Sequence, residues 1–323
     1  LDVIKNLPPK EFENFIWDNI IYANPVKEPN SLHVLNRHMP LLTYDSIEEM
    51  EKIKKHCPEA GVLLRIKVCD EGSVVKFSNK FGISPEEAPG LIEKTIKAGL
   101  TVEGISFHAG SQCNNPLNFV KALESAAYIF KEAGSRGLDI GESVSKKGYL
   151  TKILDIGGGF PVKYNGNEQS FRGLSKIINK ELDRLFPIDE VDVLAEPGRF
   201  LVANAGTEIA SVILAKHSKS PACYHLNSGI YQDFSSMIYD HAPIKLESFK
   251  NGEKSERCVF GPTCDGLDTL SENEYIHNTS KIFLPKLEEG DMIYAENMGA
   301  YTNVSATRFN GVDPAKVIHV NMK

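Results

Sequence analysis

The chain has 323 residues, which is enough for about two domains or for one large barrel with an appendage. Apolar residues make up 41% and charged residues 24%, and these fractions exclude disordered, collagen-like, coiled-coil and disulfide-scaffold proteins. The net charge of −7 argues against nucleic acid or an anionic membrane as the main partner, and no apolar run reaches the roughly 18 residues of a membrane span. The six cysteines show no CxxC and no zinc spacing, so we expect reduced thiols in a cytoplasmic protein and no metal site.

Short apolar runs alternate with amphipathic stretches through the first 200 residues. Repetition of this kind, with nearly continuous apolar strands, predicts a parallel sheet. Six units are fewer than the eight of a closed β/α barrel and about the number in a doubly wound sheet. The predicted strands are 20–23, 41–44, 62–66, 102–107, 152–156 and 191–195. The predicted helices are 46–56 with Ser46 as N-cap, 84–98 with Pro85 at its first position, and 116–133.

The pattern changes after about residue 199. Strand-like segments separated by turn formers take over, at 208–215, 222–226, 257–260 and 292–295. We therefore expect two domains, a partial barrel over 1–203 and a β-rich domain over 204–323. The polar stretch 134–148 is predicted to be an exposed loop.

The predicted strands end in polar and glycine-rich segments, and functional residues of β/α barrels collect at these ends. Three consecutive glycines, 157–159, can bring backbone N–H groups close to an anion. Arg199 and Ser111 each follow a strand and can add a charged and a hydroxyl contact to a phosphate. Together they predict a phosphate site, although three glycines alone also occur in tight turns.

Glu196 and His108 need another explanation, because a carboxylate beside a phosphate site requires a cationic partner. A pyridinium nitrogen would serve as that partner, and its flat ring would suit stacking on His108. Taken alone, His108 is better explained as a core histidine with its hydrogen bonds satisfied.

Seven segments carry a resemblance to the ornithine decarboxylase family, whose members are fold-type III enzymes that use pyridoxal phosphate (PLP). The match runs nearly end to end and in the same order. The segments are Asn24-Pro25, FHAGS at 107–111, DIGGGF at 155–160, AEPGR at 195–199, YDHA at 239–242, GPTCDGLD at 261–268 and NMGAYT at 297–302. The resemblance implies a PLP-binding β/α barrel of the alanine-racemase type, followed by a β-rich domain.

The resemblance also implies a role for each matching residue. His108 would stack on the PLP ring, Glu196 would pair with its pyridine nitrogen, and Arg65 would lie under the cofactor. The residues that would hold the phosphate are Ser111, Gly158, Gly159, Gly198, Arg199 and Tyr301. Cys264 would protonate the carbon that loses CO₂. The substrate-binding residues would be Asp240 and Asp265 at its distal amine, with Tyr231 and Phe309 lining the pocket.

General chemistry is consistent with these roles. A protonated pyridine is the strongest electron sink that PLP offers, and Glu196 would keep it protonated. A substrate with a distal ammonium needs an anionic end to its pocket, which Asp240 and Asp265 would supply. A thiol such as Cys264 is a competent proton donor near neutral pH. Without the resemblance, both aspartates are equally well explained as solvated loop carboxylates.

Two of the family's opening strands, the first with the Schiff-base lysine, have no counterpart here, so we expect a barrel that lacks its first two strands. Residues 1–19 resemble the helix that follows the second of these strands. We expect this sequence to be the visible part of a longer protein rather than a catalytically inactive fragment. Lys67 is the only candidate within this sequence to replace the Schiff-base lysine. We expect its side chain to reach solvent rather than to take that role.

The expected activity is decarboxylation of L-ornithine to putrescine and CO₂ in polyamine biosynthesis. The alternative functions are a lysine or arginine decarboxylase of the same family and an inactive regulator of the antizyme-inhibitor type. In the family, Cys264 and Asp265 reach into the partner subunit's site, which implies a homodimer with shared active sites. Antizyme stays open as a partner, because the segment 26–40, where animal members bind it, is only mildly basic.

Overall fold

The computed structural model describes residues 6–38, 40–141, 152–164, 166–187, 190–272, 276 and 279–320. The chain divides into two compact units, which we call unit 1 (residues 1–159 and 172–196) and unit 2 (residues 160–171 and 197–323). The domain boundary after residue 203 stays a prediction, and most of the loop expected at 134–148 lies outside the described residues.

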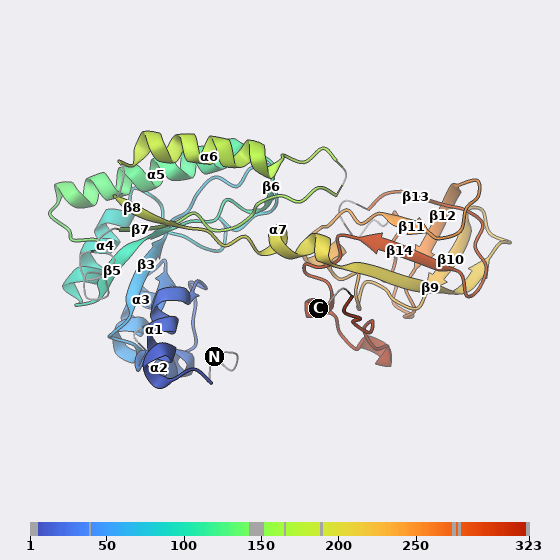
Figure 1. Cartoon of the computed structure of the whole chain (residues 1–323), viewed down its shortest axis with the longest axis horizontal. Helices are drawn as coiled ribbons and strands as arrows, with labels where there is room; N and C mark the ends of the chain where they lie inside the picture. The colour runs from blue at the N-terminus through green and yellow to red at the C-terminus, as the bar shows by residue number, and fades with distance from the viewer. Residues whose placement is uncertain are drawn as a thin grey trace. The chain divides into compact units, whose positions relative to one another are not determined.

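Unit 1 is built on a six-stranded parallel sheet that curls as an open half-barrel (Figure 1). Its strands lie side by side in chain order, so each connection is a crossover that returns the chain to the same edge. The sheet and its six strands confirm the predicted β/α architecture. The strands are β1 (Ile21–Tyr22), β2 (Leu41–Tyr44), β3 (Gly61–Arg65), β5 (Thr101–Ser106), β7 (Lys152–Asp155) and β8 (Val191–Leu194). A separate antiparallel pair consists of β4 (Ser73–Val75) and β6 (Ser111–Cys113).

Burial on both faces explains why the central strands read as continuous apolar runs. Every residue of β2 and of β3 is buried. Leu41, Leu63 and Ile153 form one inward-facing layer, against which Ile21 and Leu194 pack. Five of the six strands thus contribute to one layer of the core.

The helices of unit 1 are amphipathic crossovers with recognisable start signals. Ser46 accepts a hydrogen bond from the N–H of Glu49, which confirms it as the N-cap of α3. The neighbouring α5 and α6 are joined by an ion pair between Glu124 and Arg184, with N and O 2.8 Å apart (Figure 1). No described helix is both long and apolar enough to cross a bilayer. The helices are α1 (Pro9–Asn19), α2 (Pro29–Asn36), α3 (Ile47–His56), α4 (Ala88–Lys97), α5 (Pro116–Ser135) and α6 (Phe171–Leu185).

The predicted start of one helix was wrong. The helix expected over 84–98 with Pro85 at its first position begins instead at Ala88, with Pro89 in its first turn. Pro89 has no N–H and cannot donate to the carbonyl of Pro85, so a helix that began at Ser84 would be interrupted within one turn. The carbonyl of Ser84 instead accepts the N–H groups of Glu87 and Ala88, which makes a separate turn.

Unit 2 contains a six-stranded sheet in the order β11-β14-β9-β10-β12-β13. The four predicted strands are confirmed, and two three-residue strands were not predicted. Alternating burial along β9 packs its inward side chains into a core that includes Val212, Tyr224, Val259 and Ile293. The elements are α7 (Gly198–Val202), β9 (Thr207–Lys216), β10 (Ala222–Leu226), α8 (Ser236–Tyr239), β11 (Leu246–Ser248), β12 (Ser255–Phe260), β13 (Ile282–Leu284) and β14 (Met292–Glu296), with short 3-10 turns at Ala203–Ala205, Asn303–Ser305 and Phe309–Gly311.

A buried lysine fixes the segment that follows β1. The ammonium of Lys27 donates to the carbonyl oxygens of Asn24 and Pro25, both at 3.2 Å, and to that of Thr43 at 2.6 Å. It also pairs with Glu49 Oε1 of α3 at 2.9 Å, and both side chains are almost fully buried. Burial lowers the pKa of Lys27, and the carboxylate of Glu49 opposes that shift. The ion pair therefore ties β1, β2 and α3 together.

We expect Glu49→Gln to lower the free energy of unfolding by about 3 kcal/mol, because it leaves the buried ammonium of Lys27 without its counter-charge. Denaturant titration of the purified protein measures the change. Glu48→Gln is the matched control, since Glu48 is exposed on the same helix and its loss should stay within about 0.5 kcal/mol. Equal losses in the two variants would contradict the stabilising role of the ion pair.

Candidate active site

The carboxyl ends of four adjacent strands place the chemically active side chains of unit 1 at one edge of its sheet. Arg65 is the last residue of β3, Asp155 is the last residue of β7, and His108 and Glu196 follow β5 and β8 by two residues. Arg65 is the Cα partner of Ser106, and Ser106 is the partner of Asp155. The parallel register therefore brings residues from distant parts of the sequence into one cluster.

His108 is held as a neutral imidazole. The N–H of Gly110 donates to its Nδ1 at 3.0 Å, which places the ring proton on Nε2. Burial, and then the positive charge of Arg65, lower the pKa of His108 to about 4. Phe77 meets the imidazole edge-on, with ring centroids 4.9 Å apart and planes at 84°. The ring is therefore uncharged at neutral pH and fixed in orientation.

Asp155 and Glu196 form a carboxyl pair. Burial is the main cause that raises the pKa of Asp155 to about 8, and its hydrogen-bonding contact with Glu196 adds to the shift. Two carboxyl groups that lie this close raise the pKa of one of them, because neighbouring negative charges repel each other. Asp155 also accepts the N–H of Gly157 at 2.8 Å through Oδ1, which fixes it at the start of the glycine loop.

Arg65 is the cation nearest to this pair. It is 9% exposed, and its guanidinium lies over the ring of Phe81 at 5.8 Å. Burial lowers the pKa of Arg65, while Glu196 and Asp155 oppose the shift, so the guanidinium stays charged.

The glycine loop forms a close-fitting backbone surface beside His108. A Cβ at Gly158 would lie 2.4 Å from the carbonyl oxygen of Glu196 and 3.3 Å from Nε2 of His108. Gly159 has φ +92°, and its Cβ would lie 2.0 Å from the carbonyl oxygen of Gly110. Neither position accepts a side chain. Ser111, next to Gly110, is buried at the start of β6.

A second group of predicted residues surrounds Arg199 in unit 2. Arg199 is 5% exposed in α7, directly after Gly198, and forms an ion pair with Asp240. Its Nη1 donates to the hydroxyl of Tyr164 at 3.0 Å, and its guanidinium lies over the ring of Tyr301 at 4.9 Å. Three side chains thus surround the buried guanidinium of Arg199.

Cys264 and Asp265 lie on an exposed loop after β12. The carboxylate of Asp268, 2% exposed, accepts the N–H groups of Ile230 and Thr263 at 2.8 and 2.9 Å and the hydroxyl of Thr263 at 2.7 Å. This one carboxylate therefore joins the loop after β10 to the loop after β12.

The remaining predicted residues of unit 2 adjoin this loop. Tyr231 stacks on Phe309 with ring centroids 4.2 Å apart. Burial, and then the Asp265 carboxylate bonded to its hydroxyl, raise the pKa of Tyr231. The side-chain amide of Asn310 donates to Cys264 Sγ at 3.2 Å. The structure thus groups Tyr231, Phe309 and Asp265 around one loop, whereas Asp240 lies in the Arg199 cluster.

Residue-by-residue prediction missed the two aspartates that organise these clusters. Asp155 opens the DIGGGF segment, and its position before a strained glycine turn was the available signal. Asp268 is the last residue of the GPTCDGLD segment. A buried carboxylate that accepts backbone N–H groups produces no periodic pattern in the sequence, so its role could not be predicted there. Lys67, the alternative lysine, is exposed as expected.

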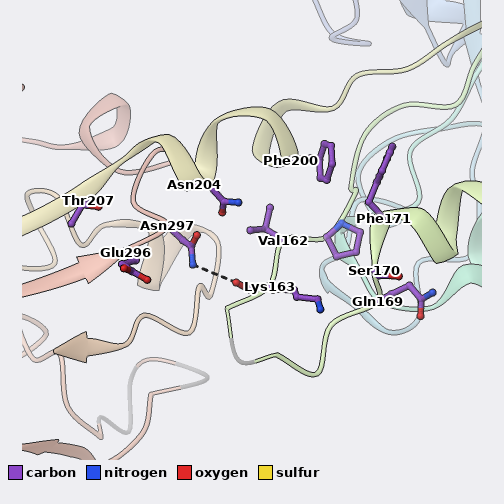
Figure 2. Close-up of a pocket in the computed structure, with 11 residues that line it drawn as sticks. Val162, Lys163, Gln169, Ser170, Phe171, Phe200, Asn204, Thr207, Glu296 and Asn297 are labelled. Carbon is purple, nitrogen blue, oxygen red and sulfur yellow. Dashed lines mark hydrogen bonds between the residues drawn. The ribbon is translucent and has the colours of Figure 1, made fainter. Parts of the chain in front are cut away.

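Unit 2 also contains a pocket of about 570 Å³ that includes none of the predicted site residues. Figure 2 shows Phe171 and Phe200 on one side, where their rings stack 4.2 Å apart, and Glu296 on the other. Asn297 crosses the pocket to donate to the carbonyl oxygen of Lys163 at 3.3 Å (Figure 2).

The half-barrel sheet and the glycine loop at its strand ends fall within a segment that matches a known family model. Residues 14–203 match the family model of the pyridoxal-dependent decarboxylase, pyridoxal binding domain. The chain belongs to this decarboxylase family, and the fold resemblance to the alanine-racemase type is confirmed.

Similar proteins share the whole length of the chain. The ornithine decarboxylase of Panagrellus redivivus is 36% identical over 94% of this chain and 70% of its own length, and that of Rattus norvegicus is 34% identical over 94% and 66%. The lysine/ornithine decarboxylase of Vibrio vulnificus complexed with cadaverine superimposes with a TM-score of 0.81 at 34% identity, covering 95% of this chain and 77% of that one. Antizyme inhibitor 2 of Xenopus laevis is 33% identical over 93% of this chain and 65% of its own length. The chain thus spans about two thirds of the length of its curated relatives.

The residues of unit 1 fit the cofactor of this family. The N–H groups of Gly158 and Gly159 donate to no group among the described residues, and the glycines leave room for a phosphate to approach them. The neutral, fixed ring of His108 offers a flat face to a pyridine ring. Asp155 lies against Glu196, and a cation beside Glu196 would offset the repulsion that helps to raise the pKa of Asp155.

We expect Asp155→Asn to change how stability depends on pH when no PLP is bound. The pKa of Asp155 is about 8 in the folded protein, above its ordinary value of 3.8. The protonated carboxyl therefore contributes its full stability below about pH 4, and this contribution is lost as the pH rises through 8. Asparagine keeps the acceptor for Gly157 but cannot ionise. The melting temperature of the variant minus that of the unsubstituted protein should therefore be larger at pH 9 than at pH 5.

Melting curves between pH 5 and 9 in PLP-free buffer measure this effect. Asp183→Asn on the exposed face of α6 serves as the control, and its curve should run parallel to that of the unsubstituted protein. A parallel curve for Asp155→Asn would show that the carboxyl pair does not hold an extra proton.

Proposed function

We propose that this chain supplies the cofactor and substrate residues of an L-ornithine decarboxylase that releases putrescine and CO₂. The observation that carries the proposal is the cluster at the strand ends of unit 1. A neutral His108, the carboxyl pair of Asp155 and Glu196 and a side-chain-free glycine loop lie together there. PLP, when bound, supplies the electron sink that makes loss of CO₂ from an amino acid possible.

The residues of unit 1 would hold and tune this cofactor. His108 would stack on its ring, and Glu196 would keep the pyridine nitrogen protonated, because its carboxylate then gains a cation within hydrogen-bonding distance. Arg65 would balance the charge of the buried carboxylates below the ring. The groups proposed to bind the phosphate are Ser111, Gly158, Gly159, Gly198, Arg199 and Tyr301.

The loops of unit 2 would bind the rest of the substrate. Asp240 and Asp265 are the proposed partners of the distal ammonium, and Asp240 currently pairs with Arg199. Tyr231 and Phe309 present a stacked aromatic wall to the aliphatic chain. Cys264 is exposed beside Asp265 and would deliver the proton to the carbon that has lost CO₂.

We also propose that the protein works as a homodimer with shared active sites. Cys264 and Asp265 are exposed although their loop is rigidly held by Asp268, which suits residues that complete a partner's site. Antizyme remains a proposed partner for the segment around α2, and the cytoplasm is the proposed location. The inactive-regulator alternative rests on the similarity to antizyme inhibitor 2.

We expect Cys264→Ala to lower kcat by at least about 100-fold with little change in KM, because the substitution removes a proton donor and leaves the binding groups in place. Cys69→Ala, at a half-exposed cysteine of unit 1, is the control and should retain full activity. Release of CO₂ from carboxyl-labelled L-ornithine measures both. An unchanged kcat in Cys264→Ala would remove Cys264 from the reaction.

The substrate is tested by comparing kcat/KM for L-ornithine, L-lysine and L-arginine with PLP supplied. The proposal expects L-ornithine to be highest, and Asp265→Asn to raise its KM with Glu289→Gln as an exposed control. A preference for lysine or arginine would overturn the substrate and keep the enzyme class. Absence of CO₂ release from all three, together with no pyridoxyl-lysine after borohydride reduction and peptide mapping, would overturn the enzyme and favour a regulator.

A further inference from the structure

Two cysteines of unit 2 lie directly opposite each other on neighbouring strands. Cys223 of β10 is the Cα partner of Cys258 of β12, and the two strands run parallel. Neighbouring strands in a sheet lie about 4.7–4.9 Å apart. Disulfides form across Cα separations of about 4.4–6.8 Å, so the backbone already has the spacing that a disulfide needs.

Both thiols are on the outward face of the sheet. Tyr224 and Val259, the next pair along the strands, are fully buried, whereas Cys223 and Cys258 are half-exposed. The following pair, His225 and Phe260, again shares the outward face, with ring centroids 5.1 Å apart. Paired residues of parallel strands point the same way, so the two thiols extend side by side toward solvent.

The surroundings of the thiols are consistent with this register. Burial, and then interaction with Cys223, raise the pKa of Cys258. Cys223 Sγ donates a weak hydrogen bond to the carbonyl oxygen of Pro221 at 3.6 Å. The charged residues close to the pair along the strands are Lys216, the Cα partner of Cys223 on β9, and Arg257 and Glu256 on β12. The pair is thus a dithiol that solvent can reach.

We propose that Cys223 and Cys258 are an oxidation site, which closes to a disulfide when the protein meets a hydroperoxide. One thiol attacks the peroxide oxygen, takes it up as a sulfenic acid and releases water from hydrogen peroxide. The second thiol then attacks the sulfenic sulfur, forms the S–S bond and releases a second water. In sum, two thiols and one hydrogen peroxide give one disulfide and two waters, and a thiol reductant reverses the change.

The site would act on the part of unit 2 that carries the substrate residues. β10 leads into the loop with Tyr231, and β12 leads into the loop with Cys264 and Asp265. A covalent bond between the strands would restrict the relative movement of both loops. The oxidation itself does not depend on the proposed function, because it follows from the sheet register alone.

The test exposes the purified protein to hydrogen peroxide, alkylates the remaining thiols and maps peptides by mass. Trypsin leaves Cys258 and Cys264 on one peptide, so a second cleavage after Phe260 is needed to separate them. We expect a linked pair of peptides that contain Cys223 and Cys258, loss of both alkylated forms in equal amounts, and full recovery with dithiothreitol. Cys69 is the comparison thiol, since it is equally half-exposed but has no cysteine beside it.

Two variants sharpen the result. In Cys223→Ser and in Cys258→Ser, the linked peptide should disappear, and the surviving thiol should be trapped by dimedone as a sulfenic acid. Linkage of either cysteine to Cys264 or to a second molecule would overturn the proposal. So would unlinked Cys223 and Cys258 at a peroxide dose that oxidises Cys69, or their separate oxidation to sulfinic acids.

Discussion

The parallel order of six strands is the constraint on which unit 1 depends. Each crossover returns the chain to the same edge, so every strand delivers its following residues to one side of the sheet. Arg65, His108, Asp155 and Glu196 are separated by up to 131 positions in the numbering, yet the register of β3, β5, β7 and β8 brings them together. The members of this site are the ends or direct continuations of paired strands, so the sheet register decides where they lie.

Burial gives this cluster its chemical character. The same low-polarity surroundings hold His108 neutral and raise the pKa of Asp155, since both shifts avoid an unpaired charge away from water. Arg65 keeps its positive charge, which Glu196 and Asp155 both favour. These features support the proposed roles, in which Glu196 would pair with a cationic ring nitrogen and His108 would offer a flat, uncharged imidazole for stacking.

Unit 2 relies on a single carboxylate in a comparable way. Asp268 bonds to Ile230 and Thr263, so one carboxylate joins the loops that follow β10 and β12. No Cβ could be added at Gly229 or Gly261 without meeting this carboxylate within 2.1 Å. Relatives named as an ornithine decarboxylase, a lysine/ornithine decarboxylase and an antizyme inhibitor resemble this chain about equally, so overall similarity alone does not distinguish these functions.

The sequence by itself determined the strands of both units that are buried or alternate clearly, the Ser46 cap, and the family, because each of these leaves a local pattern. It did not determine where α4 begins, since Pro85 and Pro89 are both acceptable helix starts and only the hydrogen bonds of Ser84 distinguish them. The roles of Asp155 and Asp268 were also decided by tertiary structure, because burial and distant N–H donors give an aspartate its function there. Cys223 and Cys258 are 35 positions apart, and only the order of strands, with β12 beside β10, makes them neighbours. Local sequence patterns reflect the secondary structure of the segment that contains them, whereas the pairing of distant strands decides which residues come into contact.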